Sequence, residues 1–118
     1  MAAKDALGKR GEDLAADYLR GAGLAIVERN WRCPLGEIDV IARDGSETVF
    51  VEVKTRAGLG YGHPLEAITA VKLARLRRLA AAWCEAHPEV SGGIRIDAIG
   101  VIASKTDGVR VEHLRRVF

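Results

Sequence analysis

Four charged side chains stand on two short, β-branched segments of this chain. Glu37 and Asp39 are two residues apart in the segment 36–43, and Glu52 and Lys54 are two residues apart in the segment 48–56. Because the side chains of a strand alternate between its faces, each pair shares one face of its strand. If the two strands pair, three carboxylates and one ammonium meet on one patch. That arrangement disfavours folding but suits a divalent metal ion beside a phosphate group.

The elements around these four residues must hold the two strands side by side. The opposite faces of the segments are apolar, so we predict that they form core: Ile38, Val40, Val49, Val51 and Val53. Asp44-Gly45-Ser46 separates the segments and is a hairpin turn signal. The carboxylates are therefore predicted to lie on a β-hairpin.

The apolar pattern predicts the remaining elements and their order. A first helix is expected from a cap at Asp5 to about residue 20, with a buried stripe at Leu7, Leu14, Ala15, Tyr18 and Ala22. Strands are expected over 24–31, 37–43, 47–56, 94–103 and 109–114. A glycine-rich loop at 57–64 is followed by a helix over about 65–87, which Pro88 ends. This αβββαββ order implies an α/β fold, with a mixed central sheet of about five strands flanked by helices.

Length and composition predict a single domain over residues 1–118. The hydrophobic content of 48% supports a real core, and the balance of 18 basic against 16 acidic residues is too even to argue nucleic-acid binding from bulk charge. We find neither a signal peptide nor an apolar run long enough to cross a membrane, so a cytoplasmic protein without membrane contact is expected. Cys33 and Cys84 are expected to be free thiols.

Asp39, Glu52 and Lys54 have the spacing D-x12-E-x-K across a hairpin. This spacing and the element order resemble the PD-(D/E)xK nuclease superfamily and its restriction-endonuclease-like core, although Ile38 stands where that motif has proline. Further segments make the chain similar to the YraN family of small bacterial proteins, which resembles archaeal Holliday-junction resolvases. These segments are Gly11-Glu12, Asn30-Trp31-Arg32, Gly36-Glu37-Ile38-Asp39, Val51-Glu52-Val53-Lys54-Thr55-Arg56 and Tyr61-Gly62-His63-Pro64.

The resemblance implies a metal-dependent endonuclease-like protein that hydrolyses phosphodiester bonds of DNA, with branched DNA as one substrate and a homodimer as the acting form. Asp39, Glu52 and the backbone carbonyl of Val53 would hold Mg²⁺ or Mn²⁺, since Mg²⁺ prefers a few carboxylates together with other oxygen ligands. Lys54 would orient or deprotonate the attacking water, or hold the phosphate. Glu37 and Glu12 would support the site. The alternative is a nucleic-acid-binding or scaffold module of the same fold without significant turnover, or a domain that binds only other proteins.

Several of these residues also have plain structural interpretations. Glu52 and Lys54 alone would suit a solvated strand face, and Glu12 would suit a solvated helix, although Gly11 permits close approach of that helix to the sheet. Lys72 lies near the apolar face of the second helix, where it could extend to solvent or contact phosphate. Asp97 is expected to form a structural salt bridge, and Trp31 and Trp83 to lie in the core. The predicted DNA contacts are Arg56, His63, Lys72, Arg75, Arg77 and Arg78.

Overall fold

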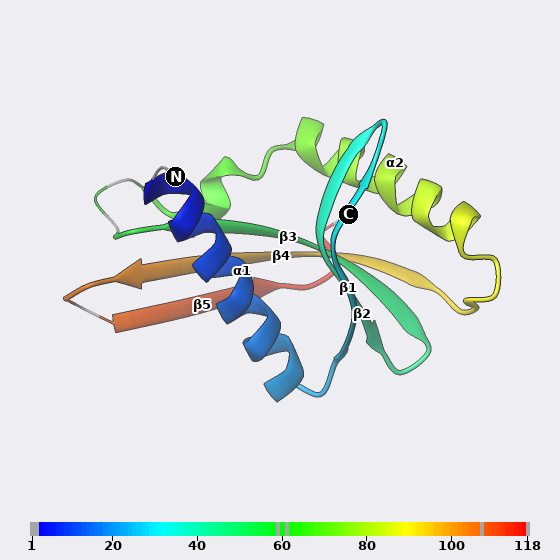
Figure 1. The fold of residues 1–118 in the computed structure, drawn as a ribbon, viewed down its shortest axis with the longest axis horizontal. Helices are drawn as coiled ribbons and strands as arrows, with labels where there is room; N and C mark the ends of the chain where they lie inside the picture. The colour runs from blue at the N-terminus through cyan, green and yellow to red at the C-terminus, as the bar shows by residue number, and fades with distance from the viewer. Residues whose placement is uncertain (1–2, 59, 61, 107, 118) are drawn as a thin grey trace.

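The computed structural model describes residues 3–58, 60, 62–106 and 108–117. Tyr61, in the predicted glycine-rich loop, lies outside the described residues. The elements follow the predicted order (Figure 1): α1 (Ala3–Gly21), β1 (Ala25–Cys33), β2 (Gly36–Asp44), β3 (Glu47–Arg56), the short 3-10 helix η2 (Pro64–Ala67), α2 (Ala70–Ala86), β4 (Ile94–Ser104) and β5 (Gly108–Leu114). The predicted α/β class is confirmed.

The five strands form one mixed sheet in the order β1-β2-β3-β4-β5. β1, β2 and β3 are a meander of antiparallel neighbours, and β5 is antiparallel to β4. β3 and β4 are parallel, in register from Thr48 opposite Ile94 to Arg56 opposite Ile102. A parallel pair needs a crossover connection, and η2 and α2 provide it.

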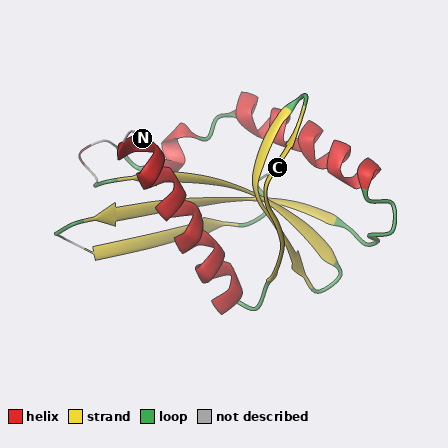
Figure 2. Cartoon of the chain, in the orientation of Figure 1, coloured by secondary structure: helices red, strands yellow, loops and turns green. Residues whose placement is uncertain are grey.

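Two apolar clusters fill the two faces of the sheet, and the two long helices are well separated with strands between them (Figure 2). Ala15 and Leu19 of α1 pack on one face with Val49, Val51, Val53 and Ile99. Leu76, Leu79, Ala80 and Trp83 of α2 pack on the other face with Phe50 and Ile96. Alternation along β3 therefore puts Glu52 and Lys54 on the α2 face, the face that also carries Phe50.

Strand β2 departs from the alternation that the sequence suggested. Ile38 and Val40 were predicted to share one core face, but Ile38 packs in the α2 cluster and Val40 in the α1 cluster. The β1–β2 hairpin curls out of the plane of the other strands, and its outer half lies beside α2 (Figure 1). Asn30, with a φ of 54°, lies in β1 between the residues that pair with Val40 and Ile38. The twist at this level turns Ile38 towards α2.

The helices differ from the prediction at their ends. The single helix over 65–87 was wrong: Ile68 is extended, and Thr69 begins α2 by accepting a hydrogen bond from the Lys72 N–H at 3.3 Å. The cap at Asp5 was also wrong because α1 begins at Ala3, and Ala22, predicted to be buried, is exposed. None of the described helices is long and apolar enough to cross a membrane.

A buried ionic network joins β4 to β5 on the α1 face and confirms the predicted salt bridge of Asp97. Asp97 is completely buried; Arg95 Nε donates to its Oδ1 at 3.0 Å, and His113 Nε2 lies 2.6 Å from its Oδ2. Burial alone would raise the pKa of Asp97, but hydrogen bonds from His113, the Arg116 N–H and Arg95 hold that pKa below its usual value.

Cys33 and Cys84 are free, as predicted, and Trp83 is buried in the core.

Candidate active site

The candidate site lies where β2 and β3 separate. Their antiparallel pairing ends at Val40 opposite Val51, so Asp39 and Glu52 occupy the next position of each strand. There Asp39 Oδ2 accepts a hydrogen bond of 2.9 Å from the backbone N–H of Val53. Because the N–H and C=O of a strand residue point to the same edge, the Val53 carbonyl lies on the edge that faces Asp39. The predicted metal-ligating atoms are thus brought together.

Glu52 and Lys54 form an ion pair beside Asp39. Lys54 Nζ lies 3.7 Å from Glu52 Oε1, and only 21% of the Glu52 side chain is exposed. Burial, followed by the charge of Asp39, raises the pKa of Glu52 to about 7, against the opposing effect of Lys54. Burial also raises the pKa of Asp39, against the hydrogen bond from Val53. The two carboxylates are therefore crowded and incompletely neutralised.

Glu12 of α1 lies near the carboxylates of Asp39 and Glu37. A Cβ built on Gly11 would lie 1.8 Å from Thr55 Oγ1, so the glycine allows α1 to approach β3 directly, as predicted. Burial, followed by the charge of Asp39, raises the pKa of Glu12, and Arg29 opposes this rise. The solvated-helix interpretation of Glu12 is thus wrong, and the residue borders the site.

Glu37 is engaged away from the centre of the site. Its Oε2 accepts a hydrogen bond of 2.6 Å from Arg32 Nε across the hairpin, although its charge still raises the pKa of Asp39 and Glu12. Among the described residues, no three His, Cys, Asp or Glu side chains are close enough to hold one metal ion. We expected Glu37, Asp39 and Glu52 to meet on one patch. The twist of β2 instead directs Glu37 towards Arg32, so Asp39 and Glu52 lie at the centre without it.

Helix α2 brings positive charge to the site. The nearby charge of Lys54 is the largest cause that lowers the pKa of Lys72, followed by burial. Lys72 and Arg75 in turn oppose the rise in the pKa of Glu52. Two ammonium groups and a guanidinium from different elements thus surround one carboxylate, an arrangement that suits an anionic ligand.

The other predicted DNA contacts are less concentrated. Arg78 is three residues from Arg75 and lies near it on α2, whereas Arg77 is about 200° around the helix from Arg75, so the basic run does not form one surface. Arg56 shares the strand face of Lys54. His63 caps η2 by accepting a hydrogen bond from the Leu65 N–H, and its Nε2 pairs with Glu112 Oε2 at 2.6 Å.

Two residues near Glu12 were missed by the reading of the sequence. Arg29 Nη2 lies 4.0 Å from Glu12 Oε1 and 2.7 Å from Asp13 Oδ1. The side chain of Asn30 hydrogen-bonds to Glu12 and opposes the rise in its pKa. An asparagine inside a strand signals a left-handed backbone position, but nothing in the sequence signals that it faces a helix.

The donor set fits a hard divalent cation. Asp39 and Glu52 offer carboxylate oxygens and Val53 a backbone carbonyl, the oxygen ligands that Mg²⁺ and Mn²⁺ accept. The raised pKa of Glu52 has a physical cause, the crowding of two buried carboxylates, that a cation between them would relieve. The residues present are therefore compatible with such an ion.

Comparison with known proteins places the chain in a family. Residues 11–101 match the model of the uncharacterised protein family UPF0102. A UPF0102 protein of Beutenbergia cavernae is 56% identical over 117 residues, and one of Clavibacter michiganensis is 54% identical over 115 residues. These matches cover 99% and 98% of this chain, respectively, and the same shares of the two relatives. The expected membership of this group of small bacterial proteins is thus confirmed, and the chain belongs to the UPF0102 family.

Proposed function

We propose that this protein is a metal-dependent DNA endonuclease that hydrolyses phosphodiester bonds, with branched DNA among its substrates. The observation that carries the proposal is the placement of Asp39 and Glu52 side by side at the divergence of β2 and β3, with Lys54 3.7 Å from Glu52. Strands position this group, so its geometry depends little on loops. The buried, crowded carboxylates cost folding energy, which argues for a functional use.

Each residue has a task in this proposal. Asp39, Glu52 and the Val53 carbonyl hold Mg²⁺ or Mn²⁺, which would neutralise phosphate charge and increase the acidity of a water molecule. Lys54 orients the attacking water or holds the phosphate. Lys72 and Arg75, on the same side of Glu52, bind the phosphate from above the sheet.

The remaining charged groups support binding and positioning. Glu12 and Glu37 hold negative charge beside Asp39 and increase the attraction of the site for a cation. Arg56 and Arg78 extend the basic surface along β3 and α2. Cleavage of both strands of a branched substrate would require two sites, so we propose a homodimer as the acting form.

Cleavage assays on several DNA shapes test the proposal. Purified protein is incubated with labelled linear, flapped and four-way DNA in Mg²⁺ and in Mn²⁺, beside the double variant Asp39→Ala/Glu52→Ala and the control Glu85→Ala, an exposed acid of α2. We expect metal-dependent cleavage by the native and control proteins only. Cleavage that survives in the double variant would contradict the proposal.

A nucleic-acid-binding scaffold without turnover is the second candidate. The basic groups around Glu52 favour it as much as they favour a nuclease, and the described residues contain no three-ligand metal cluster. It predicts salt-sensitive DNA binding in gel shifts, no cleavage with either metal, and unchanged binding by the double variant.

A further inference from the structure

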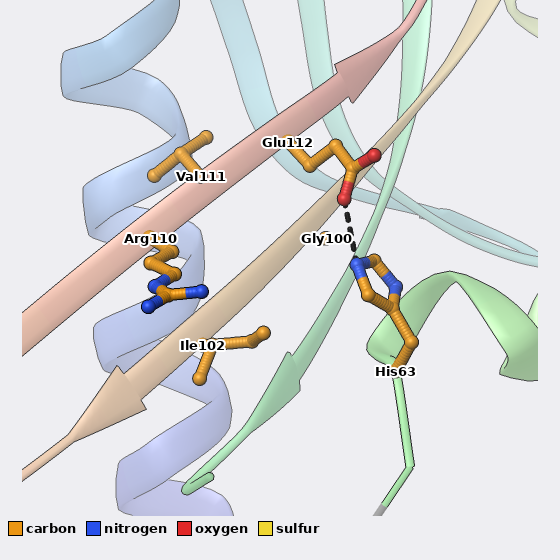
Figure 3. Close-up of a pocket in the computed structure, with 6 residues that line it drawn as sticks. All are labelled: His63, Gly100, Ile102, Arg110, Val111 and Glu112. Carbon is orange, nitrogen blue, oxygen red and sulfur yellow. Dashed lines mark ion pairs between the residues drawn. The ribbon is translucent and has the colours of Figure 1, made fainter. Parts of the chain in front are cut away.

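A second concave site lies on the α2 face of the sheet, on the far side of η2 from the carboxylates. It is a cavity of about 270 Å³, and its lining comprises His63, Gly100, Ile102, Arg110, Val111 and Glu112. Figure 3 shows Glu112, His63, Ile102 and Arg110 arranged around the stretch of β4 that carries Gly100. The proposed nuclease chemistry uses neither Arg110 nor Glu112.

The sheet register places this cavity on the same face as the candidate active site. Lys54 pairs with Gly100, which pairs with Glu112. Two residues further along, Arg56 pairs with Ile102, which pairs with Arg110. Paired residues of neighbouring strands point to the same face. With strands about 4.8 Å apart, Lys54 and Glu112 are roughly 10 Å apart along this row. The cavity therefore lies close to Lys54 along the sheet, with η2 between them, and a nucleic-acid strand bound at Lys54 would pass over η2 to enter it.

Gly100 explains how η2 builds the wall of the cavity. A Cβ at this position would lie 2.9 Å from Leu65 Cγ and 3.0 Å from Pro64 Cγ. The glycine therefore allows η2 to pack directly on β4, which holds the His63 ring over the sheet. The remaining floor is aliphatic and comes from the side chain of Ile102, because the Val111 side chain packs in the cluster on the α1 face and only its backbone borders the cavity.

The hydrogen bonds of His63 define the charge of the cavity. His63 Nδ1 accepts from the Leu65 N–H at 3.2 Å, so the ring proton belongs on Nε2, which donates to Glu112 Oε2 at 2.6 Å. The ring is then neutral, and the lining carries one positive group, Arg110, and one negative group, Glu112. The side chain of Arg110 is exposed and makes no hydrogen bond or ion pair with the residues that the structure describes.

This combination suits a neutral, flat ligand better than a phosphate, which Glu112 would repel. A nucleobase with an exocyclic amino group presents a donor for the carboxylate and acceptors for the guanidinium, together with apolar faces for the aliphatic floor. The volume lies just below the range of roughly 300–1,000 Å³ of sites for drug-sized ligands, which suits one heterocycle. A paired base already uses its Watson–Crick edge, so the base must be unpaired.

We propose that the cavity binds one unpaired, amino-bearing nucleobase of a DNA strand, with Glu112 as the acceptor and Arg110 as the donor. The inference deepens the proposed function, on which it rests for the identity of the strand. A site that receives an unpaired base beside the carboxylates would direct the protein to DNA with unpaired nucleotides, as at branches and flaps.

An NMR titration in EDTA tests the cavity apart from cleavage, because base binding requires no metal ion. Short single-stranded DNA with a central cytosine is compared with the same strand carrying an abasic site, while the amide signals of Gly100, Ile102 and Val111 are followed. Glu112→Gln and Arg110→Gln are compared with Glu89→Gln and Arg115→Gln, which make the same charge changes at exposed positions outside the cavity lining.

We expect both cavity variants to weaken binding of the cytosine strand about tenfold, the effect of losing one base-edge contact, while both controls bind as the native protein does. The abasic strand should bind more weakly and leave the three amide signals unmoved. Any of three results would overturn the proposal. The two strands could bind equally, the cavity variants could match the controls, or free dCMP could bind as tightly as the strand. Failure here with cleavage intact would leave the nuclease proposal standing, and absence of cleavage with base binding intact would remove the nuclease proposal alone.

Discussion

The carboxylate of Asp39 accepts the backbone hydrogen bond of Val53, the residue between Glu52 and Lys54, at a distance of 2.9 Å. The contact forms where the β2–β3 ladder ends. Without the Asp39 carboxylate, the Val53 N–H would have no partner from β2. One side chain of β2 is thereby locked to the segment of β3 that carries the other candidate catalytic groups. Asp39 is consequently both part of the proposed site and an element of its construction.

Replacing Asp39 separates these two roles. Asp39→Asn keeps an oxygen acceptor for Val53 and removes the charge that raises the pKa of Glu52 and Glu12, so it should leave the metal-free protein equally or more stable. Asp39→Ala also removes the acceptor and should be about 1–2 kcal/mol less stable than Asp39→Asn. Urea unfolding in EDTA measures both, and a clear loss of stability in Asp39→Asn would assign the charge a structural role.

Stability should decrease with rising pH because of Glu52. Its pKa is about 7 in the folded protein and near 4.5 when unfolded, so the folded state retains the proton over this interval. The stabilisation is complete below pH 4.5 and is lost as pH rises through about 7. Glu52→Gln should match the native protein near pH 4.5 and exceed its unfolding free energy at pH 8, by roughly 3 kcal/mol at most. Unfolding in EDTA at both pH values measures this, and parallel curves for the two proteins would contradict it.

The network around Asp97 should matter for stability and not for the site. Asp97→Asn removes the fully buried partner of Arg95, which keeps only its contacts with Asp44 and Glu47, and should cost about 1.5–3 kcal/mol in urea unfolding. Asp17→Asn, which breaks the exposed pair with Arg20, is the control and should cost less than about 1 kcal/mol. Similar small losses in both variants would show that the network contributes little.

The close approach of α1 to β3 depends on the absence of a side chain at Gly11. Gly11→Ala places a methyl group against Thr55 and should destabilise the protein by about 1–3 kcal/mol. Gly8→Ala, three residues earlier with open space around its Cβ, should instead stabilise α1 by up to about 1 kcal/mol. Thermal unfolding of the two variants gives the comparison, and an equally stable Gly11→Ala would refute tight packing at this point.

DNA affinity should distinguish the arginines of α2. Arg75→Gln removes a charge beside Glu52 and should weaken binding and reduce the salt dependence by about one phosphate contact. Arg77→Gln, on another side of the helix, should have the smaller effect. Fluorescence anisotropy over a range of salt concentrations measures both, and equal losses would place the DNA over the whole helix.

Local patterns determined most of the elements of this protein. The span 47–56 of β3 was predicted residue for residue, since alternating apolar positions and the turn at Gly45 both specify it. The strands, their order and the motif Asp39, Glu52 and Lys54 follow from the same short-range signals. The break between η2 and α2 was missed because a helical apolar pattern continues across Ile68 and Thr69, and only the cap at Thr69 shows the interruption.

Tertiary structure decided which of the charged residues meet. Glu37 and Asp39 are equivalent in the sequence pattern, yet the twist of the hairpin leaves Glu37 paired with Arg32 and locks Asp39 to Val53. Glu12 of α1 comes near Asp39, and Lys72 of α2 comes near Glu52, from helices on opposite faces of the sheet. Glu112 of β5 pairs with His63 at the start of η2. Periodicity specifies the face of an element, whereas twist and helix docking set the distances between elements, so a single sequence read locally could not supply these contacts.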